Sequence, residues 1–591
     1  MYIFNPIYNK TPQGPSLKGG SVAYNLKINK LINPTKVNFC YCKDFCAVDQ
    51  KIKMECSLQG EYFNYLINVN FNETGLYWYY FEVYQGSHKF YLQATHSFDV
   101  EPTGELKSKF QQLVYLKNSK TSNCFKGGVM YHIFVDRFCK SGEVTPRFDL
   151  VLREDWGGQI NKNSNDFKII NKECFGGNLK GIISKLNYLK SLNVNTLYLS
   201  PIFEANSYHK YDTADYLKID SMFGSQKDFA NLLKKAKEKG INIILDGVFN
   251  HTGDDSIYFN KYNNYSEIGA YQSKNSKYYN WYEFQNFPQK YSSWWGIETL
   301  PQIKKSNKEF NNFLTCKNGV IEKYMKMGLF GFRLDVVDEL AEETLNKISK
   351  SVKKIKKDGI IIGEVWEDAS NKIAYDFRKN YFLGNQLDSV MNYPVKDAII
   401  NYVLSGNSQN LKNTLYMILD HYPKEICHNL MNILGTHDTS RILSVLNENN
   451  EQENAIKLLK IASLLQYVII GVPCIFYGDE QGVLGVGAPY CRVCFPWDNQ
   501  NKRIKKWYQL LGTLRKDKVF KKGDMKVICS ENGIFGIERL DGRNKVVVYT
   551  NCSNENKIIK LNGSFINFIT NKQVTNEINL NANEFLILKN K

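Results

Sequence analysis

An arginine and an aspartate stand two residues apart in the stretch Gly331 to Asp338, GFRLDVVD. In an extended strand, residues two apart share one face, so Arg333 and Asp335 are expected to point the same way. A guanidinium beside a carboxylate lowers the pKa of the acid and orients it, which suits a nucleophile. The alternative is an ion pair that only closes the end of a strand.

Three further apolar runs in the same half of the chain also end in polar residues. They are Ile243 to His251 (IILDGVFNH), Ile360 to Trp366 (IIIGEVW) and Leu430 to Asp438 (LMNILGTHD). Continuous apolar runs of this kind are typical of buried parallel strands. In a parallel barrel the carboxyl ends of the strands meet at one rim, where catalytic residues gather. The repetition therefore favours a catalytic site over an isolated structural ion pair.

In their order along the chain, DGVFNH, GFRLDVV, GEVW and GTHD resemble the four signature regions of the α-amylase family of glycoside hydrolases. The strings HKYDTADY at 209–216 and GVPCIFYGDE at 471–480 strengthen this resemblance. It is nearest to the neopullulanase, cyclomaltodextrinase and maltogenic amylase branch, whose fifth signature, MPKLN, corresponds here to LPQIK at 300–304. The resemblance implies a retaining hydrolase of α-1,4-glucosidic bonds in maltodextrins, pullulan or cyclodextrins, with α-1,6 bonds left open.

Retaining hydrolysis needs a carboxylate nucleophile and a carboxylic acid that flank the bond to be cut. We predict Asp335 as the nucleophile and Glu364 as the acid/base, because the apolar strand before Glu364 would raise the pKa of its carboxyl group. Asp438 is the predicted third carboxylate, which binds sugar hydroxyls. We expect the Asp335 and Glu364 carboxyl groups to lie about 5 Å apart and the α-configuration to be retained.

The resemblance also implies residues that bind the substrate. Tyr211 would stack beneath the sugar at the cleavage point, and Trp366 would stack on the leaving-group sugar unless it is buried in the barrel. The two histidines would act as neutral donors to hydroxyls of the sugar, and the remaining residues would support them at the rim. These further predicted binding residues are His251, His437, Arg333, Asp246 and Asn250.

No metal ligand is predicted from the sequence. In the family, a calcium loop rich in Asn and Asp follows the first strand, whereas here Asp136-Arg137-Phe138 is followed by CKSGE. Ligands for a hard cation are therefore scarce. Asp136 could bind an ion, or it could pair with Arg137 or another nearby cation. We expect no required cofactor, and calcium stays open because its usual loop is not matched.

The 591 residues are too many for one core, so several domains are expected. Aromatic and β-branched runs in 1–120 predict an N-terminal β-sandwich like a carbohydrate-binding module. The alternation of strand and helix in 121–517 predicts an α/β fold, a (β/α)8 TIM barrel, with an inserted domain at 252–305 after the third strand. Short β-like runs in 518–591 predict a C-terminal β-sandwich.

The insertion at 252–305 is polar and aromatic, and a segment in this place would lie over the rim of the barrel. Its rings could stack on sugar faces or pack into a small core of their own, and we expect more than half of them to do the latter. The rings considered are Tyr278, Tyr279, Trp281, Tyr282, Phe284, Trp294 and Trp295.

The formal net charge of +17 comes from lysines spread along the chain, which argues against a patch for nucleic acid. The longest apolar run, 461–477, is divided by Gly471-Val472-Pro473, so a membrane span is not expected. No secretory signal is visible, and 14 cysteines without one favour reduced thiols in a cytoplasm. We therefore expect an α-glucan substrate, no nucleic acid, no membrane and a cytoplasmic location, with a homodimer left open.

Two other functions fit the same residues. A 4-α-glucanotransferase would use the same covalent intermediate with a sugar in place of water as acceptor. A catalytically silent sugar-binding protein could also use this fold, although the presence of all three acids, Asp335, Glu364 and Asp438, argues against it.

Overall fold

The computed structural model describes residues 1–116, 125–147, 149–160 and 171–590. The chain divides into two compact units. The first unit consists of Met1–Ser119, Glu367–Gln386 and Ser408–Cys427, and the second of Lys120–Trp366, Leu387–Asn407 and His428–Lys591. The predicted boundary between 120 and 121 lies outside the described residues.

Eight parallel strands form the central sheet of the second unit, in the order β26-β23-β22-β19-β16-β13-β28-β27. A parallel bridge between Met391 and Met431 joins the two ends of this sheet, which closes the barrel and confirms the predicted fold class. The strands are β13 (Met130–Ile133), β16 (Thr196–Leu199), β19 (Asn242–Gly247), β22 (Gly331–Leu334), β23 (Ile360–Gly363), β26 (Ser389–Val390), β27 (Met431–Asn432) and β28 (Val472–Phe476).

The strands of the barrel are short and buried on both faces. All four residues of β22 and all four of β23 are buried, as the continuous apolar runs indicated. Glycine is required at the start of β22, because a Cβ on Gly331 would lie 1.8 Å from the carbonyl oxygen of Ile360. The close pairing of these two strands sets the places of the acidic residues that follow them.

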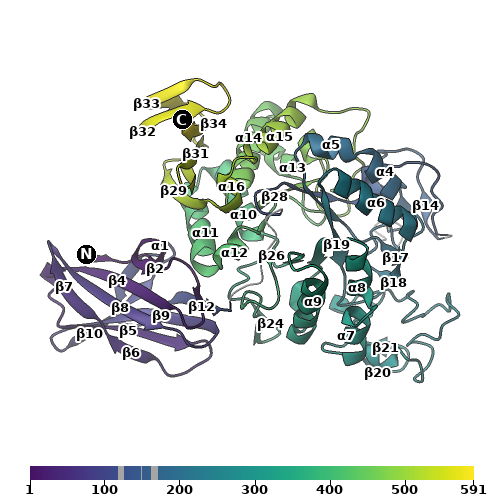
Figure 1. Ribbon diagram of the computed structural model, residues 1–591, viewed down its shortest axis with the longest axis horizontal. Coiled ribbons are helices and arrows are strands. Elements are labelled where there is room, and N and C mark those ends of the chain that lie inside the picture. The colour runs from purple at the N-terminus through teal and green to yellow at the C-terminus, as the bar shows by residue number, and fades with distance from the viewer. Residues whose placement is uncertain (117–124, 148, 161–170, 591) are drawn as a thin grey trace. The chain divides into compact units, whose positions relative to one another are not determined.

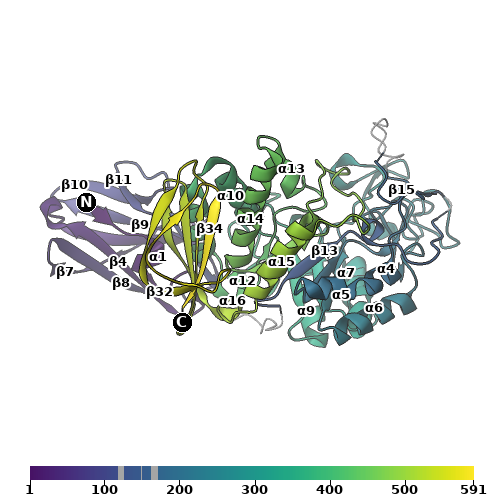
Figure 2. The same cartoon turned by 90° about the horizontal axis from the view of Figure 1, so that it is seen from above.

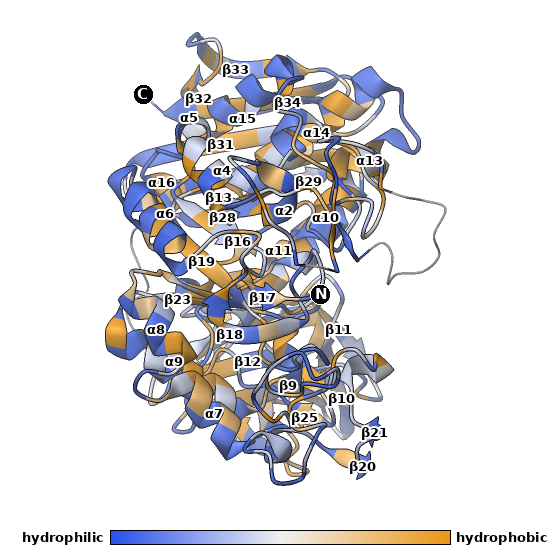
Figure 3. Ribbon diagram, turned by 90° about the vertical axis from the view of Figure 1, so that its right-hand side faces the viewer, coloured by the Kyte–Doolittle hydropathy of each residue, from blue (hydrophilic) through white to orange (hydrophobic). Residues whose placement is uncertain are grey.

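Helices follow most strands and cover the outside of the barrel, as Figure 1 shows for α6, α8 and α9. Ser225 caps α6 in a capping box with Asp228, and the buried residues of α6 recur at helical spacing. Figure 3 shows apolar and polar residues mixed along these helices. Every helix in the described residues is too short or too polar to span a bilayer. The helices are α4 (Leu179–Ser184), α5 (Leu186–Ser191), α6 (Gln226–Glu238), α8 (Val320–Lys326), α9 (Glu342–Ile355), α10 (Tyr393–Ser405), α14 (Gln452–Val468) and α15 (Lys502–Leu514).

In the first unit, two mainly antiparallel sheets share one apolar core, in which Tyr24, Tyr79 and Phe81 are fully buried. Helix α11 (Ser408–His421) also belongs to this unit, although its sequence lies inside the stretch predicted as barrel. The main strands are β4 (Ser21–Asn29), β5 (Lys36–Lys43), β8 (Tyr62–Asn70), β9 (Gly75–Gln85), β10 (His88–Ala94) and β12 (Phe110–Tyr115).

The C-terminal part of the second unit is an antiparallel sheet of six strands in the order β29-β30-β31-β34-β32-β33. Figure 2 shows these strands in yellow, and the ring of Phe585 on β34 packs 4.8 Å from that of Trp507 on α15. The strands are β29 (Asp524–Glu531), β30 (Ile534–Asp541), β31 (Asn544–Asn551), β32 (Lys557–Asn567), β33 (Gln573–Leu580) and β34 (Glu584–Asn590).

Candidate active site

One fully buried arginine joins three carboxylates at the rim of the barrel. Arg333 Nη1 donates to Asp246 Oδ1 at 2.7 Å and to Asp335 Oδ1 at 2.8 Å. Its other terminal nitrogen, Nη2, lies 2.8 Å from Glu364 Oε2. Asp246 lies near the end of β19, and Asp335 and Glu364 directly follow β22 and β23. These three strands are neighbours in the sheet. The structure therefore brings the predicted nucleophile and the predicted acid/base to one guanidinium.

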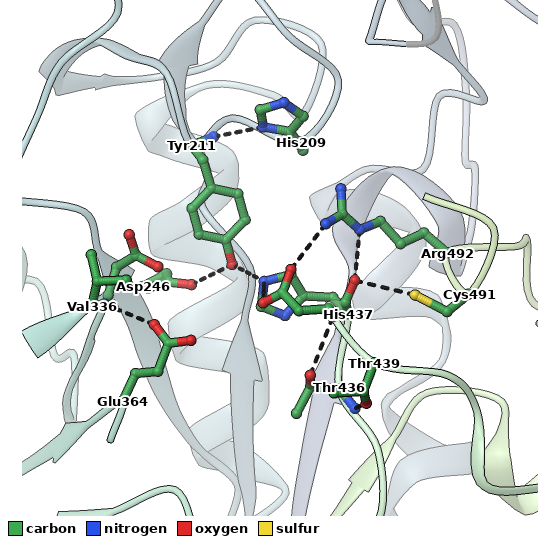
Figure 4. A network of polar contacts seen from close by, with 12 residues as sticks. His209, Tyr211, Asp246, Val336, Glu364, Thr436, His437, Thr439, Cys491 and Arg492 are labelled. Carbon is green, nitrogen blue, oxygen red and sulfur yellow. Dashed lines mark hydrogen bonds and ion pairs between the residues drawn. The ribbon is translucent and has the colours of Figure 1, made fainter. Parts of the chain in front are cut away.

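The carboxyl group of Glu364 is fixed by two further donors. The backbone N–H of Val336 donates to Oε2 at 2.8 Å, and the indole N–H of Trp366 donates to Oε1 at 3.1 Å. Val336 has φ 34°, a left-handed conformation that is strained for a β-branched residue. The strained backbone turns the N–H of Val336, the residue after Asp335, toward Glu364. The dashed line between Val336 and Glu364 in Figure 4 marks this contact.

Burial raises the pKa of Asp335 well above its usual range. The charge of Arg333 acts in the opposite direction, while the negative charges of Glu364 and Asp246 raise the pKa further. The prediction of a lowered pKa for Asp335 is therefore wrong for the free protein, because the arginine is shared among three acids and desolvation outweighs its effect.

Asp438 lies in a second polar cluster, which Figure 4 shows around His437. Its Oδ1 is 3.0 Å from Arg492 Nη2 and its Oδ2 is 3.0 Å from His437 Nε2. Partial removal from water would raise the pKa of Asp438, but His437 and Arg492 hold it well below its usual range, although 34% of the side chain stays exposed. Asp438 is thus an anion throughout the physiological range of pH.

Tyr211 links the two clusters. Its hydroxyl donates to Asp246 Oδ2 at 2.9 Å and lies 2.5 Å from His437 Nε2. The rings of Tyr211 and His437 are nearly parallel, at 8° and 5.2 Å between centroids. Polar contacts through Arg333 and Tyr211 thus connect the predicted acids with one another. Figure 4 shows the part of this network that runs from Asp246 through Tyr211 to His437.

His251 and Asn250 also lie at this rim. His251 Nδ1 is 2.5 Å from Asn250 Oδ1, and His251 Nε2 is 3.1 Å from the carbonyl oxygen of Tyr211. Burial lowers the pKa of His251 to about 4, so the imidazole is neutral near pH 7. This agrees with the neutral histidine expected from the sequence.

Trp366 is not buried in the barrel, since 46% of its surface is exposed. Its ring stacks on that of Tyr393 with 4.0 Å between centroids and 13° between planes. The exposed face lies beside Glu364, to which the indole N–H donates. Trp366 can therefore present a flat apolar surface next to the acid.

Two residues of the network were not found by sequence reasoning. Arg492 lies in the loop after β28. Tyr198 lies within β16, and its hydroxyl donates to Asp246 Oδ2 at 2.6 Å. A cation shortly after a predicted rim strand was a usable signal for Arg492. Tyr198 gave no such signal, because an aromatic residue within an apolar strand reads as core.

The carboxylates near the first strand do not fit a calcium site. Asp136 accepts the Nε–H of Arg137 at 2.6 Å and the backbone N–H of Gly176 at 2.9 Å. Asp149 pairs with Lys172 at 2.6 Å. In the described part of the chain, no group of three or more His, Cys, Asp or Glu side chains could hold a metal ion. Cations of the protein itself occupy the carboxylates that a calcium ion would need.

We expect a chelator to leave the activity within about twofold of its starting value, because Arg137 and Lys172 already neutralise these carboxylates. The measurement is reducing-sugar release before and after dialysis against EDTA. A loss of activity that added calcium restores would contradict this expectation, whereas a loss that calcium does not restore would point to another divalent ion.

Comparisons with known proteins agree with this geometry. A family model described as alpha amylase, catalytic domain, matches residues 132–534. An amylopullulanase of Thermoanaerobacterium saccharolyticum is 35% identical over 544 residues, which cover 82% of this chain and 42% of the relative. A cyclomaltodextrinase of Thermoanaerobacter pseudethanolicus is 30% identical over 526 residues, which cover 87% of this chain and 86% of the relative.

The solved structures add support for the fold alone. A structure named cyclomaltodextrinase matches with a TM-score of 0.73 at 22% identity, covering 100% of this chain and 99% of the other. The chain spans less than half the length of the amylopullulanases that it matches.

Proposed function

This chain belongs to the α-amylase family of glycoside hydrolases, and we propose that it hydrolyses α-1,4-glucosidic bonds in maltodextrins, pullulan or cyclodextrins with retention of configuration. The observation that carries the proposal is the Arg333 guanidinium, which holds the carboxylates of Asp335 and Glu364 side by side at the rim. The names of the relatives, amylopullulanase and cyclomaltodextrinase, support this class of substrate.

In the first step, a carboxylate oxygen of Asp335 bonds to the anomeric carbon as the bond to the leaving sugar breaks. Glu364 gives its proton to the leaving oxygen. In the second step, Glu364 takes a proton from water, and the water oxygen displaces Asp335 from the sugar. Glu364 must therefore carry a proton, and Asp335 must be ionised, when the first step begins.

The pKa of Asp335 is raised in the free protein, so substrate binding must help to leave Asp335 ionised. Arg333 contacts both acids, so its charge stabilises the Asp335 anion once the proton is on Glu364.

The second cluster would bind the sugar at the cleavage point. We assign Asp438 to its hydroxyls, because Arg492 and His437 keep this carboxylate ionised. Tyr211 would stack beneath the sugar. His251 would donate to a hydroxyl once its Nε2–H leaves the carbonyl oxygen of Tyr211, which accepts it in the free protein. Asp246 and Asn250 would hold Arg333 and His251 in place.

Transfer to a second sugar is the alternative outcome of the same intermediate. The half-exposed ring of Trp366 lies beside Glu364 and favours transfer to a sugar, because an aromatic face can hold an acceptor sugar where water would otherwise attack. Analysis of the products shows whether water or a second sugar is the acceptor.

The test is a product profile on maltohexaose, pullulan and β-cyclodextrin, with the anomeric form of the first product read by NMR. We expect shorter maltooligosaccharides with the α-anomer appearing first. Products longer than the maltohexaose supplied would show transfer. First release of the β-anomer would reject the pairing of Asp335 with Glu364, and no release from any of the three would favour a sugar-binding protein.

A further inference from the structure

Two segments of the chain meet beside Asp438. The first follows β27 and contains Asp438 and Arg441, and the second follows β28 and contains Arg492. Each segment sends an arginine side chain to the other. Arg492 holds Asp438, whereas Arg441 is completely buried and is used in no step of the proposed reaction.

The guanidinium of Arg441 contacts three residues of the second segment. Its Nε–H donates to the carbonyl oxygen of Cys491 at 2.8 Å. Its Nη1 donates to the carbonyl oxygen of Tyr477 at 2.6 Å and to Asp479 Oδ1 at 2.9 Å. The guanidinium carbon also lies 4.3 Å from the ring centroid of Phe476. Arg441 thus ties both ends of the 477–491 stretch to the first segment.

The link from Arg492 runs in the opposite direction. Arg492 Nε donates to the carbonyl oxygen of His437 at 2.8 Å, and Nη2 donates to Asp438 Oδ1 at 3.0 Å. The thiol of Cys491 donates to the same oxygen of His437 at 3.2 Å, as Figure 4 shows. We call these two reciprocal links the Arg441–Arg492 clamp.

The peptide group between Cys491 and Arg492 lies at the centre of the clamp. A peptide group is planar, so the bond from Arg441 to the Cys491 carbonyl also orients the N–H of Arg492. That N–H donates to the Pro489 oxygen at 3.0 Å. Arg441 therefore sets the direction in which the Arg492 side chain leaves the backbone.

The second segment needs such a tie because it is rich in glycine. Residues 478–487 include four glycines, three of which have a positive φ between 64° and 89°. Glycine gives the backbone more conformational freedom than any other residue. The N–H of Arg441 donates to the Gly485 oxygen at 2.9 Å, and the N–H of Gly487 donates to Ser440 Oγ at 3.0 Å. The second segment therefore takes its shape from the first.

We infer that Arg441 is a positioning residue for the hydrolysis, which fixes the peptide group before Arg492 so that Arg492 holds Asp438 in the orientation that binds the sugar. Arg441 acts without touching the substrate, since its side chain is completely buried. This inference rests on the proposed function, in which Asp438 binds hydroxyls of the sugar at the cleavage point.

Arg441→Met is expected to lower kcat/KM on maltohexaose by about 10²-fold, because a small displacement of Arg492 misplaces Asp438. The assay is run well below the melting temperature of each variant. Arg441→Lys should show a similar loss although it keeps a cation beside Asp479, because an ammonium lacks the planar fork of donors. It replaces Arg441→Met throughout if that variant does not fold. A wild-type kcat/KM would overturn the inference.

Lys353→Met is the matched control. Lys353 also pairs with a buried acid, Asp388, at 2.8 Å, and it donates to the carbonyl oxygen of Gly359 at 2.6 Å. Asp388 directly precedes β26, so this pair lies at the amino end of the strand, away from the rim. We expect Lys353→Met to lower the melting temperature but to leave kcat/KM within about twofold. An equal fall in kcat/KM would contradict the clamp, because the loss would then follow from removing any buried cation.

A double-mutant cycle separates positioning from general support of the fold. If Arg441 acts through Arg492, then Arg441→Met combined with Arg492→Met should be no worse than Arg492→Met alone, within about twofold in kcat/KM. Losses that multiply would show that Arg441 acts independently of Arg492 and would reject the clamp.

Binding to an inactive protein keeps this inference apart from the proposed function. With Asp335→Asn in every protein, calorimetry measures the affinity for maltohexaose with and without Arg441→Met. A loss of affinity that Arg492→Met reproduces supports the clamp even if the wild type shows no hydrolysis, in which case only the proposed function fails. No loss, or a loss that Arg492→Met does not reproduce, rejects the clamp whatever the wild type does.

Discussion

Replacing Asp335 with asparagine is expected to lower reducing-sugar release from maltohexaose by about 10⁴-fold or more, because an amide cannot form the glycosyl ester. The protein should stay folded, since Arg333 keeps its contacts with Asp246 and Glu364. The measurement is the initial rate of release, with circular dichroism as the check on the fold. Asp358→Asn is the control, because Asp358 pairs with Lys356 at a partly exposed site.

The same substitution should stabilise the protein near neutral pH. The pKa of Asp335 is raised in the folded state, so the folded protein binds more protons than the unfolded chain above the unfolded pKa of about 4. The stability from this group is complete below that pKa and is lost as the pH rises through the folded pKa. The asparagine of Asp335→Asn does not ionise, so the variant does not lose this stability. Its melting temperature should exceed that of the wild type at pH 7 and approach the wild-type value toward pH 4. A lower melting temperature at pH 7 would refute the raised pKa.

Replacing Arg333 with methionine is expected to cost about 3–5 kcal/mol of stability at pH 7, because it leaves three buried carboxylates without their cation. Activity should be lost as well. Thermal unfolding followed by calorimetry measures the effect. The loss should shrink at lower pH, since the uncompensated acids then take up protons and their charge repulsion disappears.

Arg539→Met is the matched control for this pH dependence. Arg539 is also buried, but its guanidinium donates to the backbone oxygens of Val468 and Gly523. Its removal leaves no buried acid, so its cost should be the same at pH 5 and pH 7. If the cost of Arg333→Met were equally independent of pH, the three acids would not be the reason for that cost.

The polar residues at the strand ends could be predicted from the sequence, because each belongs to a pattern of residues close together in the chain. Arg333 and Asp335 share a face through the two-residue repeat of a strand, and their shared contact at 2.8 Å confirms that step. The shift in the pKa of Asp335 could not be predicted in the same way. It depends on burial and on Asp246, which is 87 residues from Arg333 and reaches it only through the pairing of β19 with β22.

Boundaries were harder to predict than elements. The apolar spacing of residues 178–192 is typical of one long helix, but in the structure Lys185 ends α4 and begins α5. Helix α11 looked like part of the barrel because helical periodicity does not reveal which core a helix joins. Asp420 on α11 pairs with Lys10, and a partner 410 residues away has no local signature.

Through this ion pair, the N-terminal strands and helix α11, which lies far along the chain, depend on each other for stability. Both side chains are almost completely shielded from water, so a shortened protein without the first strands would retain Asp420 as a lone anion in an apolar environment. Losing one member of a shielded pair typically costs about 3–5 kcal/mol. A shortened protein would therefore need a substitution of Asp420 on α11 to avoid this cost.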